Sequence, residues 1–96
     1  MSITRPRHKV DANQAEIVDA LLAAGYRLQT LATVGNGTPD LLASKGGIMW
    51  LLECKMPGEK VSDLQKKWAA TWAAPVYVVH DVYEALAAVE KGRDQP

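Results

Sequence analysis

The chain has 96 residues, 48% of them apolar and 23% charged, which is typical of one globular domain with a modest core and no room for a second. Its formal net charge is zero, so the composition gives none of the support for a nucleic-acid partner that a strongly basic chain would give. Cys54 is the only cysteine, which excludes an intrachain disulfide and a cysteine-based zinc site.

Residues 1–10 show no hydrophobic periodicity and carry three basic side chains, Arg5, Arg7 and Lys9. We interpret them as a flexible basic arm ahead of a single domain at residues 11–92, with a frayed tail at 93–96. No charged segment followed by an apolar segment opens the chain, and we therefore expect a cytoplasmic protein.

The first helix is predicted to begin after Asn13, as its N-cap, and to end at Gly25. Glu16 stands three positions after Asn13 and completes a capping box. One apolar stripe is expected to face the core, and its residues are Ile17, Val18, Leu21 and Leu22. Glu16 lies roughly opposite this stripe, but small alanines surround it there, so both faces of the helix could be covered.

Three strands are predicted in succession, and their ranges are 26–32, 39–42 and 48–55. Gly46-Gly47 can turn the chain tightly between the second and the third. An antiparallel hairpin of these two strands would bring Asp40 across from the end that holds Glu53. The third of these strands, residues 48–55, is the most apolar, so we expect it to be central in the sheet.

Charge occurs only at selected points of this hairpin. Glu53 and Lys55 are two residues apart and project to the same face, while Cys54 points away. A half-exposed ion pair contributes little stability, and Asp40 alone could be a turn residue that binds its own backbone. Asp40 precedes the apolar pair Leu41-Leu42, however, and burying two carboxylates with a lysine is costly unless they are compensated. Hard oxygen ligands suit Mg²⁺ or Mn²⁺, so the pattern predicts a divalent metal site.

A second helix is predicted after Ser62, its N-cap, with Gln65 at the capping-box position. Its large apolar residues recur every four positions and predict a stripe that packs on the core; they are Leu64, Trp68 and Trp72. Pro75 breaks this helix. The apolar run over residues 68–79 is too short to span a bilayer, and we expect no membrane partner.

Residues 76–79 form a continuous apolar run, as expected for a strand buried on both faces. A final helix over residues 83–91 is predicted to end at Gly92. The resulting order is helix, three strands, helix, strand, helix. A crossover through the second helix would place the last strand parallel to its neighbour, beside the central hairpin.

These residues also carry a family resemblance. Pro39-Asp40, with Glu53-Cys54-Lys55 beginning thirteen positions after Asp40, resembles the PD-(D/E)xK nuclease signature. The wider pattern is closer still to the virus-type replication-repair nuclease (VRR-NUC) family. The chain shows the motifs of that family in the same order, and they are Glu16, Gly37-Thr38-Pro39-Asp40-Leu41-Leu42, Gly46-Gly47, Glu53-Cys54-Lys55, Gln65 and residues 76–79. The resemblance spans roughly residues 11–90. It implies a restriction-endonuclease-like α/β core, αβββαβ(α), with a small mixed sheet flanked by helices.

The resemblance implies metal-dependent hydrolysis of phosphodiester bonds. Asp40, Glu53 and the backbone carbonyl of Cys54 would hold Mg²⁺ or Mn²⁺. Lys55 would donate to the attacking water or to the charge that builds on the phosphate. Gln65 would help to hold water or phosphate, although a capping role explains it equally well.

The first helix supplies an acidic residue in this family. Glu16 has that place in the order and would bind a second metal ion or orient a water molecule. Its alternative role is that of a capping partner, and Asp11, just ahead of the helix, is then the candidate acid.

The implied substrate is DNA. Small stand-alone members of the family look like homodimeric resolvases of four-way (Holliday) junctions in bacterial or phage-infected cells, and a two-fold dimer would supply paired sites. The basic residues expected to contact branched DNA are Lys60, Lys66, Lys67, Arg5, Arg7 and Lys9. A flap or single-strand nuclease and a non-catalytic DNA-binding or assembly module remain alternatives. A small α/β domain with purely structural charges would leave Asp40 unexplained.

Overall fold

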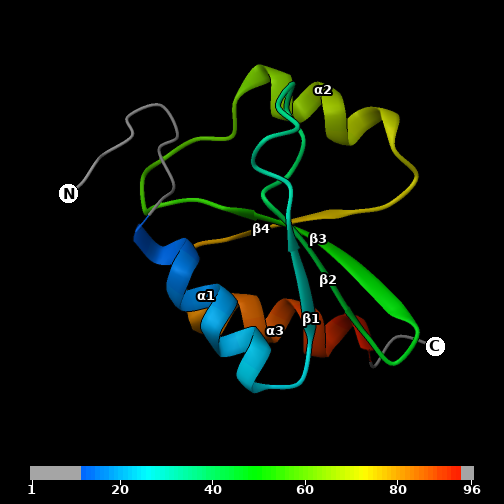
Figure 1. Cartoon of the computed structure of the whole chain (residues 1–96). Helices are drawn as coiled ribbons and strands as arrows, with labels where there is room; N and C mark the ends of the chain where they lie inside the picture. Colours follow the sequence, from blue (N-terminus) through cyan, green and yellow to red (C-terminus); the bar gives the residue numbers. More distant parts are fainter. Residues whose placement is uncertain (1–11, 94–96) are drawn as a thin grey trace.

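The computed structural model describes residues 12–93, which form one mixed four-stranded sheet flanked by three helices (Figure 1). In chain order the elements are α1 (Ala12–Ala23), β1 (Arg27–Thr30), β2 (Leu41–Lys45), β3 (Ile48–Cys54), α2 (Asp63–Thr71), β4 (Val76–Val79) and α3 (Val82–Arg93). The predicted α/β class and order of elements are confirmed. The predicted arm at residues 1–10 and the last residues of the predicted tail lie outside the described residues. No helix between residues 12 and 93 is long and apolar enough to cross a membrane.

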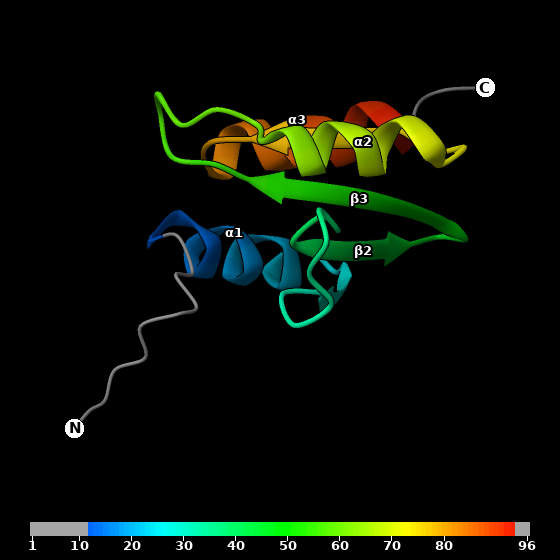
Figure 2. The same ribbon diagram turned by 90° about the horizontal axis from the view of Figure 1, so that it is seen from above.

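The sheet has the strand order β1-β2-β3-β4. The first three strands pair antiparallel, and β4 returns through α2 to pair parallel with β3. Figure 2 shows β2 and β3 side by side with opposed directions. Gly46 and Gly47 join them with φ of 62° and 84°, which a two-residue hairpin turn of this hand requires. The parallel crossover confirms the predicted place of the last strand beside the hairpin.

The first helix begins at Ala12, two residues earlier than predicted, and the N-cap assignment of Asn13 is wrong. Asn13 lies inside α1, where its buried side chain donates hydrogen bonds to the backbone carbonyls of Lys55 and His80 at 3.1 and 2.8 Å. The other end of the helix is as predicted. Gly25 has φ of 93°, and the N–H groups of Gly25 and Tyr26 return to the carbonyls of Leu22 and Leu21 in a Schellman motif.

The hydrophobic core lies on one face of the sheet. Figure 1 shows α1 and α3 on that side. Alternate residues of β2 and β3 point into it, Cys54 among them. Ile17 and Leu21 of α1 are fully buried and Val18 packs beside them, whereas Leu22 is 51% exposed, so the predicted stripe is one residue narrower than expected. The carboxyl end of β3 is therefore held in place by Cys54, whose side chain is buried in this core.

The second helix covers the opposite face of the sheet, and the prediction of a core-packed stripe on it is wrong (Figure 1). No residue of α2 is buried, and Leu64 and Trp72 are 58% and 57% exposed. Trp68 and Trp72 instead stack on each other, with ring centroids 4.7 Å apart and planes 14° apart. The helix ends at Thr71, ahead of Pro75, and leaves an apolar cavity between its last turn and the sheet.

Two predictions about the end of the chain need correction. The strand β4 is an edge strand, and Val78 is 38% exposed, so it is not buried on both faces. The last helix does not end at Gly92 but continues to Arg93.

Candidate functional site

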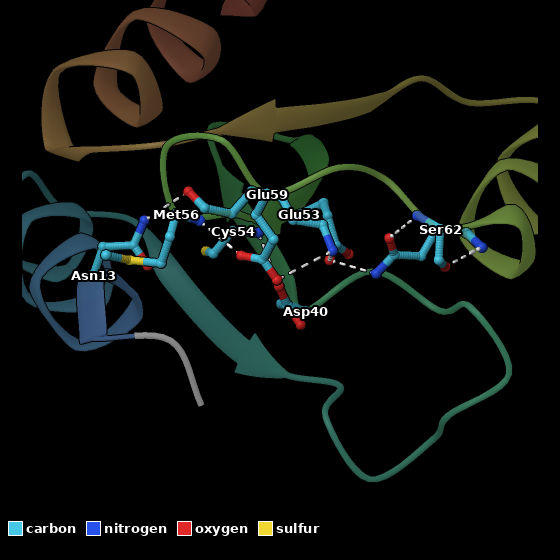
Figure 3. Close-up of polar contacts among 9 residues, drawn as sticks. Asn13, Asp40, Glu53, Cys54, Met56, Glu59 and Ser62 are labelled. Atoms are coloured by element: carbon cyan, nitrogen blue, oxygen red, sulfur yellow. Dashed lines mark hydrogen bonds and ion pairs between the residues drawn. The ribbon is translucent and has the colours of Figure 1, made fainter. Parts of the chain in front are cut away.

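The strand register sets Asp40 opposite Glu53. The antiparallel ladder of β2 and β3 ends at the pair Leu41–Leu52, and one further step in the same register joins Asp40 to Glu53. Residues directly opposite each other on antiparallel strands project to the same face. Alternation along β3 puts Lys55 on that face too. Figure 3 shows Asp40 and Glu53 close together at the end of the two strands.

Backbone groups hold Asp40 on both sides. The N–H of Cys54 donates to its Oδ2 at 2.8 Å, and its own carbonyl accepts from Leu31 N–H at 2.8 Å. The carboxylate is thereby tied to β3, and its backbone to the segment that follows β1. Because a strand residue directs its N–H and C=O to the same side, the Cys54 carbonyl lies on the side of β3 that faces Asp40.

Glu53 is a buried carboxylate, with only 3% of the residue exposed. Gln65 donates its side-chain Nε2–H to Glu53 Oε2 at 2.7 Å. Gln65 is itself fixed by the predicted capping box of α2, in which its Oε1 accepts from Ser62 N–H at 2.8 Å and its own N–H donates to Ser62 Oγ at 3.2 Å. Gln65 therefore caps α2 and binds Glu53 at the same time, because its amide oxygen accepts from Ser62 while its amide nitrogen donates to Glu53.

Lys55 is a buried lysine between two carboxylates. Its Nζ lies 3.5 Å from Glu53 Oε2 and 3.8 Å from Glu59 Oε2, and its side chain is 9% exposed. Its backbone is held from two elements, since its N–H donates to the Val79 carbonyl and its own carbonyl accepts from Asn13. The ammonium therefore has a defined place in a region where a lone charge would be costly.

The two carboxyl groups have perturbed pKa values. Burial raises the pKa of Glu53 to about 7, and the nearby charge of Asp40 adds to that rise, while Lys55 opposes it. Burial also raises the pKa of Asp40, against the lowering effects of its hydrogen bonds with Cys54 N–H and Glu53 and of the Lys55 charge. Two buried carboxyl groups that resist ionisation together indicate a place where a further positive charge would be stabilising.

The donor set fits a magnesium-type ion. Two hard carboxylates and a backbone carbonyl on one side of β3 are oxygen ligands, and Mg²⁺ commonly takes one or two carboxylates and keeps several waters. Within residues 12–93, no group of three or more His, Cys, Asp or Glu side chains is arranged to hold a metal ion. The site therefore offers a two-carboxylate set rather than a full protein cage.

The structure does not bring every predicted residue to this place. Glu16 has an exposed side chain on α1, and it does not form a three-carboxylate group with Asp40 and Glu53. Asp11, the alternative acid, lies outside the described residues, as do Arg5, Arg7 and Lys9. The predicted DNA-binding lysines of the described part are all exposed, and they are Lys60, Lys66 and Lys67.

Two residues at the site were missed by sequence reasoning. Asn13 was interpreted as a helix cap, yet its side chain ties α1 to the backbone of Lys55. Glu59 was not considered, although it stands four positions after Lys55. The signal for Glu59 was present, because Pro57-Gly58 predicts a tight turn that returns the chain toward the end of β3.

A cavity of about 370 Å³ opens beside Glu53, between α2 and the sheet. Its lining includes Gln65 and Lys66 from α2, and Gly37 and Pro39 from the loop that precedes Asp40. Gly37 comes so close to α2 that a Cβ atom there would lie 2.3 Å from the Leu64 carbonyl oxygen. This close approach joins the Asp40 loop to the helix that carries Gln65.

No protein-family model matches the chain, and no curated protein or solved structure matches it significantly.

Proposed function

We propose that this protein is a divalent-metal-dependent deoxyribonuclease of the PD-(D/E)xK type, related to the VRR-NUC family. One observation carries the proposal: Asp40 and Glu53 are paired by the strand register at the end of the central hairpin, and Lys55 is buried on the same face. The αβββαβα order and the mixed sheet are compatible with that fold.

Each residue of the site has a chemical task in this proposal. Asp40, Glu53 and the Cys54 carbonyl would hold Mg²⁺ or Mn²⁺, which would supply Lewis-acid polarisation of the phosphate and a lowered pKa of water. Cys54 N–H and Gln65 orient the two carboxylates through the hydrogen bonds at 2.8 and 2.7 Å. Lys55 carries a charged donor toward the attacking water or the phosphate, where it stabilises negative charge that grows during the reaction.

DNA is the substrate that the surroundings of the site support best. Lys66 lines the cavity beside Glu53, and Lys60 and Lys67 are exposed on the loop and helix that follow β3. Exposed ammonium groups close to a metal site suit the phosphates that flank a scissile bond.

We further propose that the active species is a two-fold homodimer that cuts four-way junctions. The described chain leaves apolar side chains exposed on both sides of the sheet, Leu22 on α1 and Trp72 at the C-cap of α2, and a second copy would cover one of these two faces. A two-fold axis would also present two equivalent sites to opposed strands of a junction.

One assay tests these proposals together. Purified protein is incubated with linear, flap and four-way DNA in Mg²⁺, in Mn²⁺ and in excess EDTA, and its mass is measured by light scattering. Paired, symmetric cuts in the four-way junction by a species of twice 10.4 kDa, abolished by EDTA, are the expected result. Cleavage in EDTA would refute the metal site, and cleavage of the flap alone would replace resolvase by flap nuclease.

A further inference from the structure

The turn after β3 supplies a second carboxylate to Lys55. Glu59 Oε2 lies 3.8 Å from Lys55 Nζ, slightly farther than Glu53 Oε2 at 3.5 Å. The two carboxylates differ in what else they do. Glu53 is paired with Asp40 and accepts from Gln65, whereas Glu59 is 41% exposed and stands outside the proposed metal pair.

The backbone gives Glu59 a defined position despite its exposure. Pro57 and Gly58 occupy the central positions of a tight turn, and Gly58 has φ of 86°, as a type II turn requires at that place. Glu59 N–H closes the turn on the Met56 carbonyl at 3.0 Å. In return, Met56 N–H donates to Glu59 Oε1 at 2.8 Å (Figure 3), and the other carboxylate oxygen, Oε2, is the one that lies 3.8 Å from Lys55 Nζ.

We propose that Glu59 is a positioning residue for Lys55, which holds the ammonium at the site once Glu53 has bound a cation. This inference rests on the proposed metal-dependent function. A cation on Asp40 and Glu53 takes up their charge and repels the ammonium of Lys55. The ammonium is buried, so without another anion it would turn away toward solvent. Glu59, at 3.8 Å from Lys55 Nζ, is a second carboxylate that can retain it.

The simpler interpretation is that Lys55 and Glu59 form a partly exposed ion pair that contributes little. The two interpretations differ in one respect. If the pair is incidental, removing the charge of Glu59 has the same small effect on the Lys55 ammonium with and without metal. If Glu59 is a positioning residue, removing its charge displaces the ammonium only after the cation has bound Glu53.

Glu59→Gln is the test variant. The amide keeps an oxygen that accepts from Met56 N–H, so the turn is preserved while the negative charge that faces Lys55 is removed. Glu84→Gln is the matched control. Glu84 also lies four residues after its basic partner, accepts a backbone N–H at 2.9 Å from His80, and makes its pair on the surface of α3.

The first readout needs no catalysis. The Lys55 ammonium is followed by ¹⁵N side-chain NMR, with its signal assigned by its loss in Lys55→Arg, before and after addition of Mg²⁺. In the wild type and in Glu84→Gln, proton exchange of the ammonium should change little on metal addition. In Glu59→Gln the proton-exchange rate of the ammonium should rise about fivefold, and only with Mg²⁺ present. A fivefold change corresponds to the upper end of the free energy that a single ion pair contributes.

The second readout is kinetic. With Mg²⁺ and cleavable DNA, Glu59→Gln should lower kcat by about fivefold or more, while KM for DNA and the half-saturating Mg²⁺ concentration stay unchanged, because an interaction made only along the reaction is lost. Glu84→Gln should leave all three as in the wild type.

The outcomes separate this inference from the proposed function. If the wild type cleaves no DNA, the nuclease proposal fails, and the ammonium readout still decides the role of Glu59. If Mg²⁺ leaves the ammonium of Glu59→Gln as protected as that of Glu84→Gln, the positioning role is refuted, even in an active nuclease. The same holds if Mg²⁺ does not bind the wild type at all.

Discussion

Gln65 and Glu53, twelve residues apart in the chain, are joined by a hydrogen bond of 2.7 Å from the amide Nε2 to the carboxylate Oε2. The other end of the same amide accepts from the N-cap residue of α2 at 2.8 Å. The start of a helix thereby orients a buried carboxylate on a neighbouring strand. Removing either contact releases the other, which makes the pair a sensitive point for mutation.

Gln65→Ala should weaken metal binding and lower the cleavage rate without unfolding the protein. The substitution removes the neutral donor that Gln65 gives to Glu53 and costs α2 part of its cap, about 1 kcal/mol of the free energy of unfolding. Gln29→Ala is the control, since Gln29 is an exposed glutamine that bonds only to the neighbouring Thr30 carbonyl among the contacts described. Manganese titration by calorimetry and thermal melting measure the two effects. Equal metal affinity in both variants would contradict a role for Gln65 at the site.

Glu53→Gln should abolish cleavage while the fold persists. The amide has the same shape, so the packing at the end of β3 is kept and the buried charge that would hold the cation is lost. Circular dichroism and thermal melting check the fold, and a four-way junction assay checks activity. A variant that unfolds, or that cuts at the wild-type rate, would place Glu53 in a structural role instead.

The metal-free protein should lose stability as the pH rises from about 4.5 to about 7. The folded pKa of Glu53 lies near 7, above its ordinary value of 4.5, so the folded state binds more protons than the unfolded state in this window. The free energy of unfolding then falls with pH, by roughly 3 kcal/mol at most for a shift of this size. Mg²⁺ should offset the loss above pH 7, because it stabilises the ionised pair. Chemical denaturation at several pH values, with and without Mg²⁺, measures this. A profile that does not change with pH in Glu53→Gln would assign the effect to Glu53.

Gly37→Ala should destabilise the protein far more than Gly35→Ala. Both glycines have positive φ, 85° and 74°, so both substitutions carry similar backbone strain. A Cβ at Gly37 would lie 2.3 Å from the Leu64 carbonyl oxygen, whereas one at Gly35 meets nothing within 4 Å. The difference between the two variants in the free energy of unfolding isolates the contact of the loop with α2. We expect this difference to be about 2 kcal/mol or more. Comparable melting temperatures would mean that the loop is not held against the helix.

Replacing Lys66 and Lys67 by Gln should weaken DNA binding and make it less dependent on salt. Both side chains are exposed on α2, and Lys66 lines the cavity beside Glu53. Each phosphate contact that is lost should reduce the slope of log affinity against log salt by roughly 0.9 on duplex DNA. Fluorescence anisotropy at several salt concentrations measures the slope. An unchanged slope would move the DNA-binding surface away from α2.

Local interactions account for what the sequence alone determined. The hairpin across Gly46-Gly47 and the alternation of Glu53 and Lys55 depend on residues close in the chain, so their patterns were readable. The capping box of Ser62 and Gln65 is similarly local, because it spans a single helical turn. From these, the pairing of Asp40 with Glu53 followed once the strands were antiparallel.

Contacts between distant segments were decided only by the tertiary structure. Asn13 had the pattern of a helix cap, but the carbonyls of Lys55 and His80, 42 and 67 residues away, bind its side chain instead. Glu16 faces solvent because α1 packs through Ile17 and Leu21, which fixes the rotation of the helix. Trp72 had the spacing of a core residue, yet no residue of α2 is buried and Trp72 is 57% exposed. Periodicity records that a face is apolar, whereas the packing of distant elements determines which apolar face is buried.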